Sequence, residues 1–107
     1  MKSYLYPQQE LQRRALSWAL RVKVNPTVVR IEVMKDKWGY CTSDGEVSLA
    51  EDLVGMDERF QDYVIVHELL HLRLPRHNQR FKALMAAYIP DWRTMDAQVR
   101  ETRSALD

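Results

Sequence analysis

Cysteine is nearly absent from this sequence, and so are long apolar runs. Cys41 is the one cysteine among 107 residues, so the chain cannot form an internal disulfide. No apolar run approaches the roughly 20 residues that span a membrane, and the first ten residues, MKSYLYPQQE, lack the apolar core of a signal peptide. We therefore expect a cytoplasmic protein that does not insert into a membrane.

A strong charge of either sign is missing as well. The 16 basic and 15 acidic residues leave a net charge of +1, which gives no overall electrostatic case for nucleic acid or a membrane surface. The stretch 72–82 is the exception, because it contains Arg73, Arg76, Arg80 and Lys82 and no acid. This stretch is either a solvated helix end or a positive rim that favours acidic substrate segments or a polyanion. Nucleic-acid binding therefore stays open as an alternative.

All three histidines fall within one eleven-residue window, HELLHLRLPRH. On an α-helix, His67 and His71 are rotated by only about 40° from each other and can direct two imidazole nitrogens at one ion. Glu68 is rotated by about 100° from His67, which suits a general base better than a ligand. The spacing therefore predicts a catalytic metal site, most simply for one zinc ion.

The residues around the motif predict that its helix is buried. Between Tyr63 and Leu72 the apolar side chains surround the whole helix circumference, as in a helix at the centre of a domain. Burying imidazoles and a carboxylate there without partners costs on the order of a few kcal/mol, and a bound metal offsets that cost. A merely polar helix face is the weaker interpretation.

The remaining pattern predicts one α+β domain over residues 1–107. A helix is expected at 8–22, followed by three strands near 29–33, 38–42 and 47–49, with a two-residue turn at Asp44-Gly45. The motif helix is expected to be capped by Asp57 and to end before Pro75. Two further helices follow, the first with Asn78 as a possible cap. We expect a mostly antiparallel three-stranded sheet covered by helices.

Three segments, KWGYCTSDGEVSLAEDLV, YVIVHELLHLRLPRHNQRF and YIPDW, resemble the YgjP-like zinc metallopeptidase domain. This is a minimal zincin family, similar to SprT-type and minigluzincin metallopeptidases. The resemblance implies peptide or unfolded protein substrates and one Zn²⁺ ion held by His67, His71 and His77, with Glu68 as the catalytic residue. Lys37 and Tyr40 stand where the family segment RWGSC has arginine and serine.

The third ligand has competitors. His77 has the spacing of the third histidine in HExxHxxGxxH peptidases, but Leu74 occupies the glycine position, so the turn must avoid a positive φ. Asp91 is an alternative ligand. A cysteine-ligated hydrolase of the deformylase type, using Cys41, is a further alternative, although the other deformylase segments are absent.

The chemistry expected at this site is hydrolysis of a peptide bond, with Glu68 moving the proton of the attacking water to the leaving amine. Tyr63 is a candidate oxyanion donor or a core residue, and Tyr40 and Tyr88 are weaker candidates. The expected strand 38–42 resembles the edge strand that binds an extended peptide in zincins, with Trp38, Gly39, Tyr40 and Cys41 as substrate-binding residues.

The alternative function is a non-catalytic or latent zinc-binding domain that associates with a partner or with DNA. For latency, the C-terminal segment ETRSALD carries acids that could cap the metal. A monomer is expected rather than an oligomer.

Overall fold

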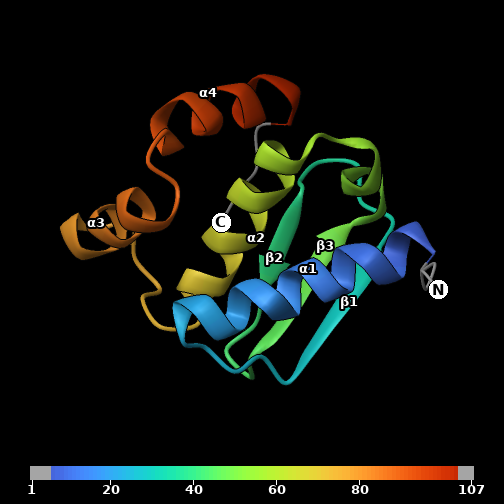
Figure 1. The fold of residues 1–107 in the computed structure, drawn as a ribbon, viewed down its shortest axis with the longest axis horizontal. Helices are drawn as coiled ribbons and strands as arrows, with labels where there is room; N and C mark the ends of the chain where they lie inside the picture. The colour runs from blue at the N-terminus through green and yellow to red at the C-terminus, as the bar shows by residue number, and fades with distance from the viewer. Residues whose placement is uncertain (1–5, 104–107) are drawn as a thin grey trace, which may run out of the picture.

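The computed structural model describes residues 6–103 and shows an α+β fold. In chain order the elements of this part are α1 (Pro7–Val22), β1 (Val28–Glu32), β2 (Gly39–Cys41), β3 (Glu46–Ala50), the short 3₁₀ helix η1 (Glu51–Gly55), α2 (Glu58–His71), α3 (Gln79–Tyr88) and α4 (Trp92–Thr102) (Figure 1). The predicted fold class is confirmed, with each expected helix and strand present within a few residues.

The sheet is mixed, and its strand order is β1-β3-β2. β2 and β3 form the expected antiparallel hairpin, but β1 pairs with β3 in parallel. The expectation of a mostly antiparallel sheet is therefore wrong for β1. The reason is that β3 takes the central position, where Val47, Ser48, Leu49 and Ala50 are all buried. β2, which is antiparallel to β3, is therefore an edge strand of the sheet.

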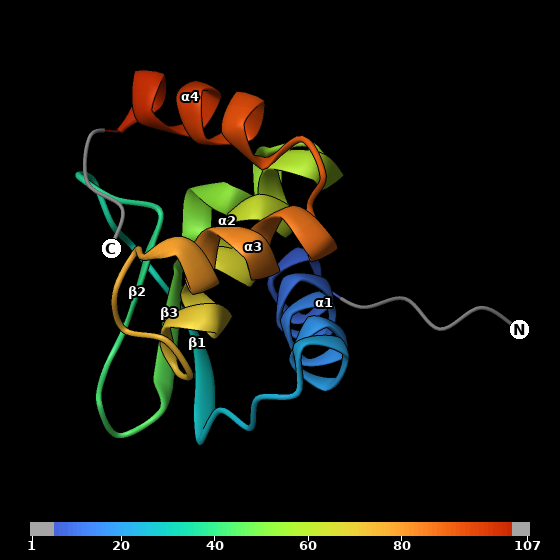
Figure 2. The same ribbon diagram turned by 90° about the vertical axis from the view of Figure 1, so that its left-hand side faces the viewer.

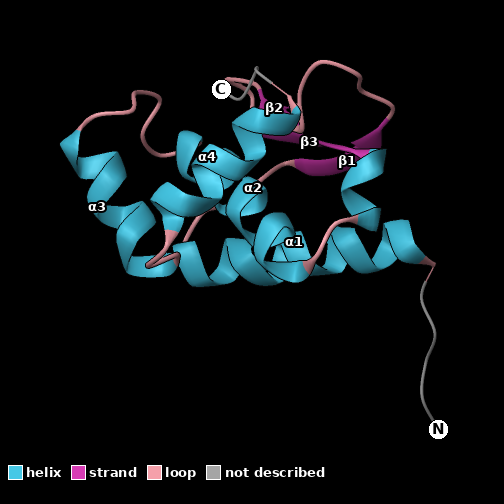
Figure 3. Ribbon diagram, turned by 90° about the horizontal axis from the view of Figure 1, so that it is seen from above, coloured by secondary structure: helices cyan, strands magenta, loops and turns pink. Residues whose placement is uncertain are grey.

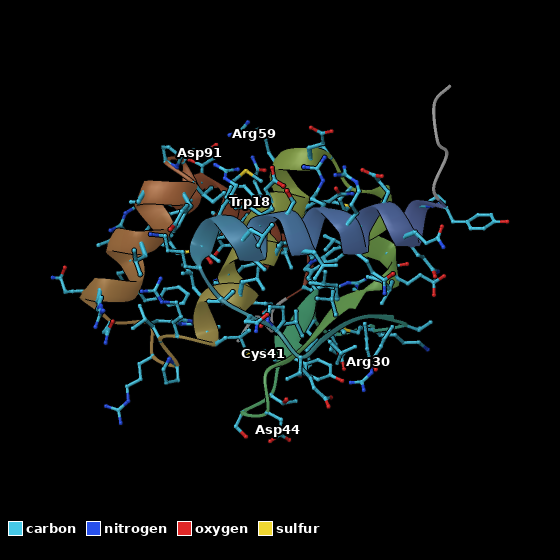
Figure 4. The ribbon with its side chains drawn as sticks, turned by 60° about the horizontal axis from the view of Figure 1, so that its bottom comes forward. Trp18, Arg30, Cys41, Asp44, Arg59 and Asp91 are labelled. Atoms are coloured by element: carbon cyan, nitrogen blue, oxygen red, sulfur yellow. The ribbon has the colours of Figure 1, made fainter. Side chains whose placement is uncertain are left out.

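The turn between β2 and β3 is longer than the Asp44-Gly45 dipeptide predicts. Thr42 N–H donates to Glu46 O (2.9 Å), so the loop holds Ser43, Asp44 and Gly45. Gly45 has φ 86°, as in three-residue hairpin loops that end on a left-handed glycine. Asp44 lies at the tip of this hairpin (Figure 4).

The helices lie on one side of the sheet (Figure 3). α1 packs on β1, while α2 packs on β2 and β3 and also contacts α1, α3 and α4. Figure 2 shows α2 in the middle of this arrangement. Every residue of α2 from Tyr63 to Leu70 is buried, which confirms the prediction of a buried motif helix.

The helix starts agree with the sequence. Asp57 accepts a hydrogen bond from Phe60 N–H (2.9 Å) at the start of α2, and Asn78 accepts one from Phe81 N–H (3.1 Å) at the start of α3. These caps satisfy amide groups that have no partner inside the helix. Both predicted caps are confirmed, and they fix where the motif helix and the following helix begin.

The end of α4 is tied to the loop before β2. Arg103 donates to Met34 O and to Lys37 O, both at 3.0 Å, and forms an ion pair with Asp52. Its guanidinium also lies 3.9 Å from the ring centroid of Trp38. The C-terminal segment considered for latency begins at residue 101, and its residues 104–107 lie outside the described part. Among residues 6–103, no helix is long and apolar enough to cross a membrane.

Candidate metal centre

The three histidines come together at the end of α2 and in the loop that follows. One nitrogen from each of His67, His71 and His77 lies within 4.8 Å of the other two, the one such group of potential ligands among residues 6–103. His71 Nε2 and His77 Nε2 are 2.8 Å apart. His67 is buried, His71 half-buried and His77 exposed. The group therefore runs from the core to the surface.

The loop after α2 brings His77 back without a glycine. Leu74 N–H still donates to Leu70 O (2.8 Å), and Arg73 donates to Val22 O (3.1 Å), which ties the loop to the end of α1. Lys23 is the one non-glycine residue with a positive φ among the described residues. Leu74 thus avoids a positive φ, as the sequence predicts, and the chain turns at Leu72 and Arg73 and bends at Arg76 instead.

Phe81 is an unpredicted member of this centre. Its ring centroid lies 5.4 Å from that of His67 and 4.9 Å from those of His71 and His77. Phe81 is 3% exposed, so it forms an apolar wall that the three imidazoles share. The sequence shows Phe81 only as one apolar residue at helical spacing, and no motif marks its contact with the histidines.

Glu68 lies beside the histidines and against the edge strand. It is fully buried, and its Oε2 is 3.6 Å from His67 Nδ1. A Cβ at position 39 would lie 3.1 Å from Glu68 Cγ and 3.0 Å from Ser48 O. Contacts under 3.4 Å are too close for a carbon side chain unless the neighbour moves. A side chain at position 39 would therefore need Glu68 or β3 to move by a few tenths of an ångström.

This donor set fits a transition metal. Zinc accepts neutral imidazole nitrogens at about 2.0–2.1 Å, so two ligands of one ion can be up to about 4.2 Å apart. The 2.8 Å separation of His71 and His77 is within that limit, whereas the widest separation in the group, up to 4.8 Å, requires the imidazoles to draw together around an ion. Three protein ligands leave a coordination position open, as in catalytic sites.

The competing ligands lie elsewhere. Asp91 forms an ion pair with Arg59 and precedes α4 (Figure 4). Cys41 is half-buried on β2. Neither belongs to the group of ligand atoms that the described residues form. The geometry therefore favours His77 over both alternatives.

Tyr63 packs against His67, the buried member of the three histidines. Its ring centroid is 5.8 Å from that of His67, and its hydroxyl donates to Asp96 Oδ1 (2.5 Å). Burial, together with this hydrogen bond, raises the pKa of the Tyr63 hydroxyl. The other two candidate oxyanion donors are also engaged, since Tyr40 donates to Glu32 (2.9 Å) and Tyr88 to Arg21 O (3.2 Å).

The predicted edge-strand residues do not share one role. Trp38 is a core residue that stacks edge-on against Phe60 at 5.0 Å and donates to Thr102 (2.8 Å). Hydrogen bonds from Ala50 N–H to Trp38 O and from Thr42 N–H to Glu46 O show that the residues on either side of β2 direct their backbone groups toward β3.

Because facing pairs alternate in an antiparallel ladder, Tyr40 also directs its backbone toward β3, where it is opposite Ser48. Gly39 and Cys41 direct their N–H and C=O groups away from β3, to the outer edge. No other strand among the described residues pairs with that edge. Backbone groups that could bind an extended peptide thus lie beside Glu68.

Two hollows flank the histidines. One, of about 550 Å³, is lined by His71, the β2–β3 hairpin and the segment that joins α1 to β1. The other, of about 260 Å³, is lined by His67 and His77 together with residues of α3 and α4. The candidate metal centre therefore opens to the surface on two sides.

Comparison with known proteins agrees with this geometry. The family described as "YgjP-like, metallopeptidase domain" matches residues 6–102. Among solved structures, the metallopeptidase zymogen abylysin of Pyrococcus abyssi is 19% identical, with a TM-score of 0.70 over 87% of this chain and 91% of that chain. The metallopeptidase zymogen jannalysin of Methanocaldococcus jannaschii is 18% identical, with a TM-score of 0.74 over 85% of this chain and 94% of that chain. No curated protein matches significantly.

Proposed function

The chain belongs to the YgjP-like metallopeptidase domain family, and on this premise we propose that it is a zinc-dependent peptidase acting on extended segments of peptides or unfolded proteins. The observation that carries the proposal is the meeting of three imidazole nitrogens within 4.8 Å of one another, with the carboxylate of Glu68 buried beside them. His67, His71 and His77 would hold the ion.

When bound, zinc supplies a Lewis acid that lowers the pKa of a bound water to about 7 and polarises a carbonyl. Glu68 acts as the general base that takes the proton of the attacking water and returns it to the leaving amine. Gly39 of β2 packs against Glu68, and the full burial of Glu68 keeps solvent away from its carboxylate on this side. Phe81 does the same for the imidazoles.

The outer edge of β2 would bind the substrate. The N–H and C=O groups of Gly39 and Cys41 can pair with an extended peptide as a further strand. Because Gly39 lies against Glu68, a peptide on this edge would pass close to the proposed base. Selection by backbone groups favours unfolded segments, since folded proteins have few free extended strands.

The experiment that tests this function measures cleavage of an unstructured protein by mass spectrometry of the products. The same protein sample is assayed as purified with its metal content known, after chelation, and after addition of zinc. We expect cleavage at internal peptide bonds that disappears with the metal and returns with it. Cleavage that survives complete removal of metal would contradict the proposal.

A latent form of the same peptidase is the second candidate. Abylysin and jannalysin were both solved as metallopeptidase zymogens, and we propose that residues 104–107 belong to a segment that restrains activity. A truncation after Arg103 tests this, because it keeps the contacts of Arg103 with the loop before β2. Increased cleavage by the shortened chain is expected, and unchanged cleavage would dismiss the segment. A cytoplasmic location and a monomeric state stay predictions.

A further inference from the structure

We propose that the 260 Å³ cavity beside His67 and His77 is a substrate subsite for a carboxylate, either the side chain of glutamate or aspartate or the free C-terminus of a peptide. The inference rests on the proposed peptidase function and names part of its specificity. Its basis is the lining of the cavity, which combines an apolar floor with cationic groups next to two of the three histidines.

Three cationic side chains line this cavity, Lys82 from α3 and Arg93 and Arg100 from α4, and they face one carboxylate, that of Asp96. Arg100 Nε donates to both oxygens of Asp96 at 3.0 Å, so this pair is largely neutral. Neither Lys82 nor Arg93 forms an ion pair with an acid of residues 6–103, and Arg93 lies over the Trp92 ring at 4.5 Å. Two positive charges are thus left to attract an anion.

Not every cation of the basic stretch 72–82 lines this cavity. Arg73 turns away to donate to Val22 O, and Arg80 does not line the cavity. Lys82 is the member of the stretch that does, and its partners Arg93 and Arg100 come from a helix with no basic motif. The positive charge of this subsite therefore comes from residues of two helices that only the fold brings together.

The volume and the apolar base of the cavity suit one amino-acid side chain better than a larger ligand. Phe81 and Met85, 3% and 1% exposed, form an apolar base that suits methylene groups. A volume of about 260 Å³ is below the roughly 300–1,000 Å³ of pockets that hold whole drug-sized ligands. An apolar stem ending in a carboxylate, as in glutamate, matches both the base and the cationic rim.

The test compares cleavage of peptides that differ at one position near the scissile bond, with Glu, Gln or Lys, each made with a free C-terminus and as the C-terminal amide. We expect kcat/KM for Glu to exceed that for Gln by roughly 3- to 10-fold, as two partly exposed cations allow. This preference should appear mainly in KM and should shrink at high salt. A preference that follows the free C-terminus instead assigns the cavity to the terminal carboxylate, which also supports a carboxylate subsite.

Variants locate the effect. The double substitution Lys82→Ala and Arg93→Ala is expected to reduce the Glu preference to less than about 2-fold, since it removes both unpaired cations. Arg80→Ala is the matched control, because Arg80 is an exposed cation of the same helix that does not line the cavity, and it should keep the preference. Lys82→Glu should favour the Lys peptide. An unchanged preference in the double variant would overturn the proposal.

A binding measurement separates this inference from the proposed function. Fluorescence anisotropy gives the affinity of labelled Glu and Gln peptides for the zinc-loaded Glu68→Gln variant, in which the peptide stays intact. If the Glu peptide binds more tightly and the double variant loses this difference, the subsite is supported, even if the wild-type chain cleaves neither peptide. Absence of cleavage would then contradict the proposed function alone. Equal cleavage and equal binding of the Glu and Gln peptides would contradict the subsite alone.

Discussion

Gly39, which has no side chain, allows Glu68 to pack against the edge strand beside the three histidines. A Cβ there would be 3.1 Å from Glu68 Cγ, so the proposed base packs closely against the edge strand at this position. From the sequence, Gly39 is expected only as a substrate-binding residue of the edge strand. The structure adds a contact with the proposed base, because the nearest side chain is that of Glu68.

Gly39→Ala is expected to lower kcat while zinc stays bound. The added methyl requires Glu68 Cγ to move by a few tenths of an ångström. Because misplacement of a catalytic group by about 1 Å can cost on the order of 100-fold in rate, a smaller loss is expected here. Overpacking should also reduce the free energy of unfolding by about 1–3 kcal/mol. Steady-state kinetics, zinc analysis and urea unfolding measure these effects. Gly55→Ala is the control, since a Cβ there meets nothing within 4 Å; equal kinetics of the two variants would show that Gly39 does not position Glu68.

His77 and Asp91 can be separated by their metal content. His77→Ala removes one of three grouped nitrogens, so zinc should dissociate during dialysis against a weak chelator. Asp91→Ala should retain about one zinc per chain, because Asp91 is paired with Arg59. Elemental analysis of both dialysed variants decides the assignment. Loss of zinc from the Asp91 variant alone would reverse it.

At the scale of the elements, α4 is connected to the motif helix through one side-chain network. The hydroxyl of Tyr63 on α2 donates to Asp96 on α4, and Arg100 holds the same carboxylate. Because a phenol has one proton to donate, this hydrogen bond uses the group that would otherwise stabilise an oxyanion.

Tyr63→Phe is therefore expected to affect stability more than catalysis. Loss of the hydrogen bond should lower the free energy of unfolding by about 0.5–3 kcal/mol, the range for a hydrogen bond to a charged or neutral partner. The kcat should stay within a few fold of the wild-type value. If Tyr63 were the oxyanion donor, kcat would fall by about 100- to 1,000-fold instead. Denaturant titration and kinetics on the same preparation distinguish the two roles.

The register of β2 identifies the residue at which substrate binding can be blocked. Tyr40 directs its backbone toward β3, so proline at position 40 would damage the sheet. Cys41 directs its N–H to the outer edge, where proline is tolerated in edge strands. Cys41→Pro is expected to raise KM strongly and to leave the zinc content unchanged. Cys41→Ala should resemble the wild type. Normal KM in the proline variant would exclude peptide binding along this edge.

Across the whole molecule, the features read from local patterns are the ones that the sequence predicted well. The caps at Asp57 and Asn78, the all-round apolar helix and the i, i+4 histidines depend on neighbours within a turn or two, so spacing is sufficient to find them. The parallel pairing of β1 with β3 depends on which strand can be buried on both faces, and local alternation does not reveal this.

Contacts between distant segments were also missing from the sequence prediction. Arg103 closes the end of α4 onto the loop before β2, 66 residues away for Lys37 and 69 for Met34. Phe81 contacts three histidines, and Lys82 and Arg93 line the same cavity. No pattern in a single sequence marks these pairs, because each follows from the way α3 and α4 pack on the rest of the fold.

The central claim is that one zinc ion held by three histidines and a base at Glu68 cleave peptide bonds. The most direct test measures zinc content and cleavage of an unstructured protein in the same samples of wild type and Glu68→Ala. The account predicts about one zinc per chain in both and a loss of cleavage of at least about 100-fold in the variant. Cleavage at the wild-type rate by zinc-loaded Glu68→Ala would contradict it.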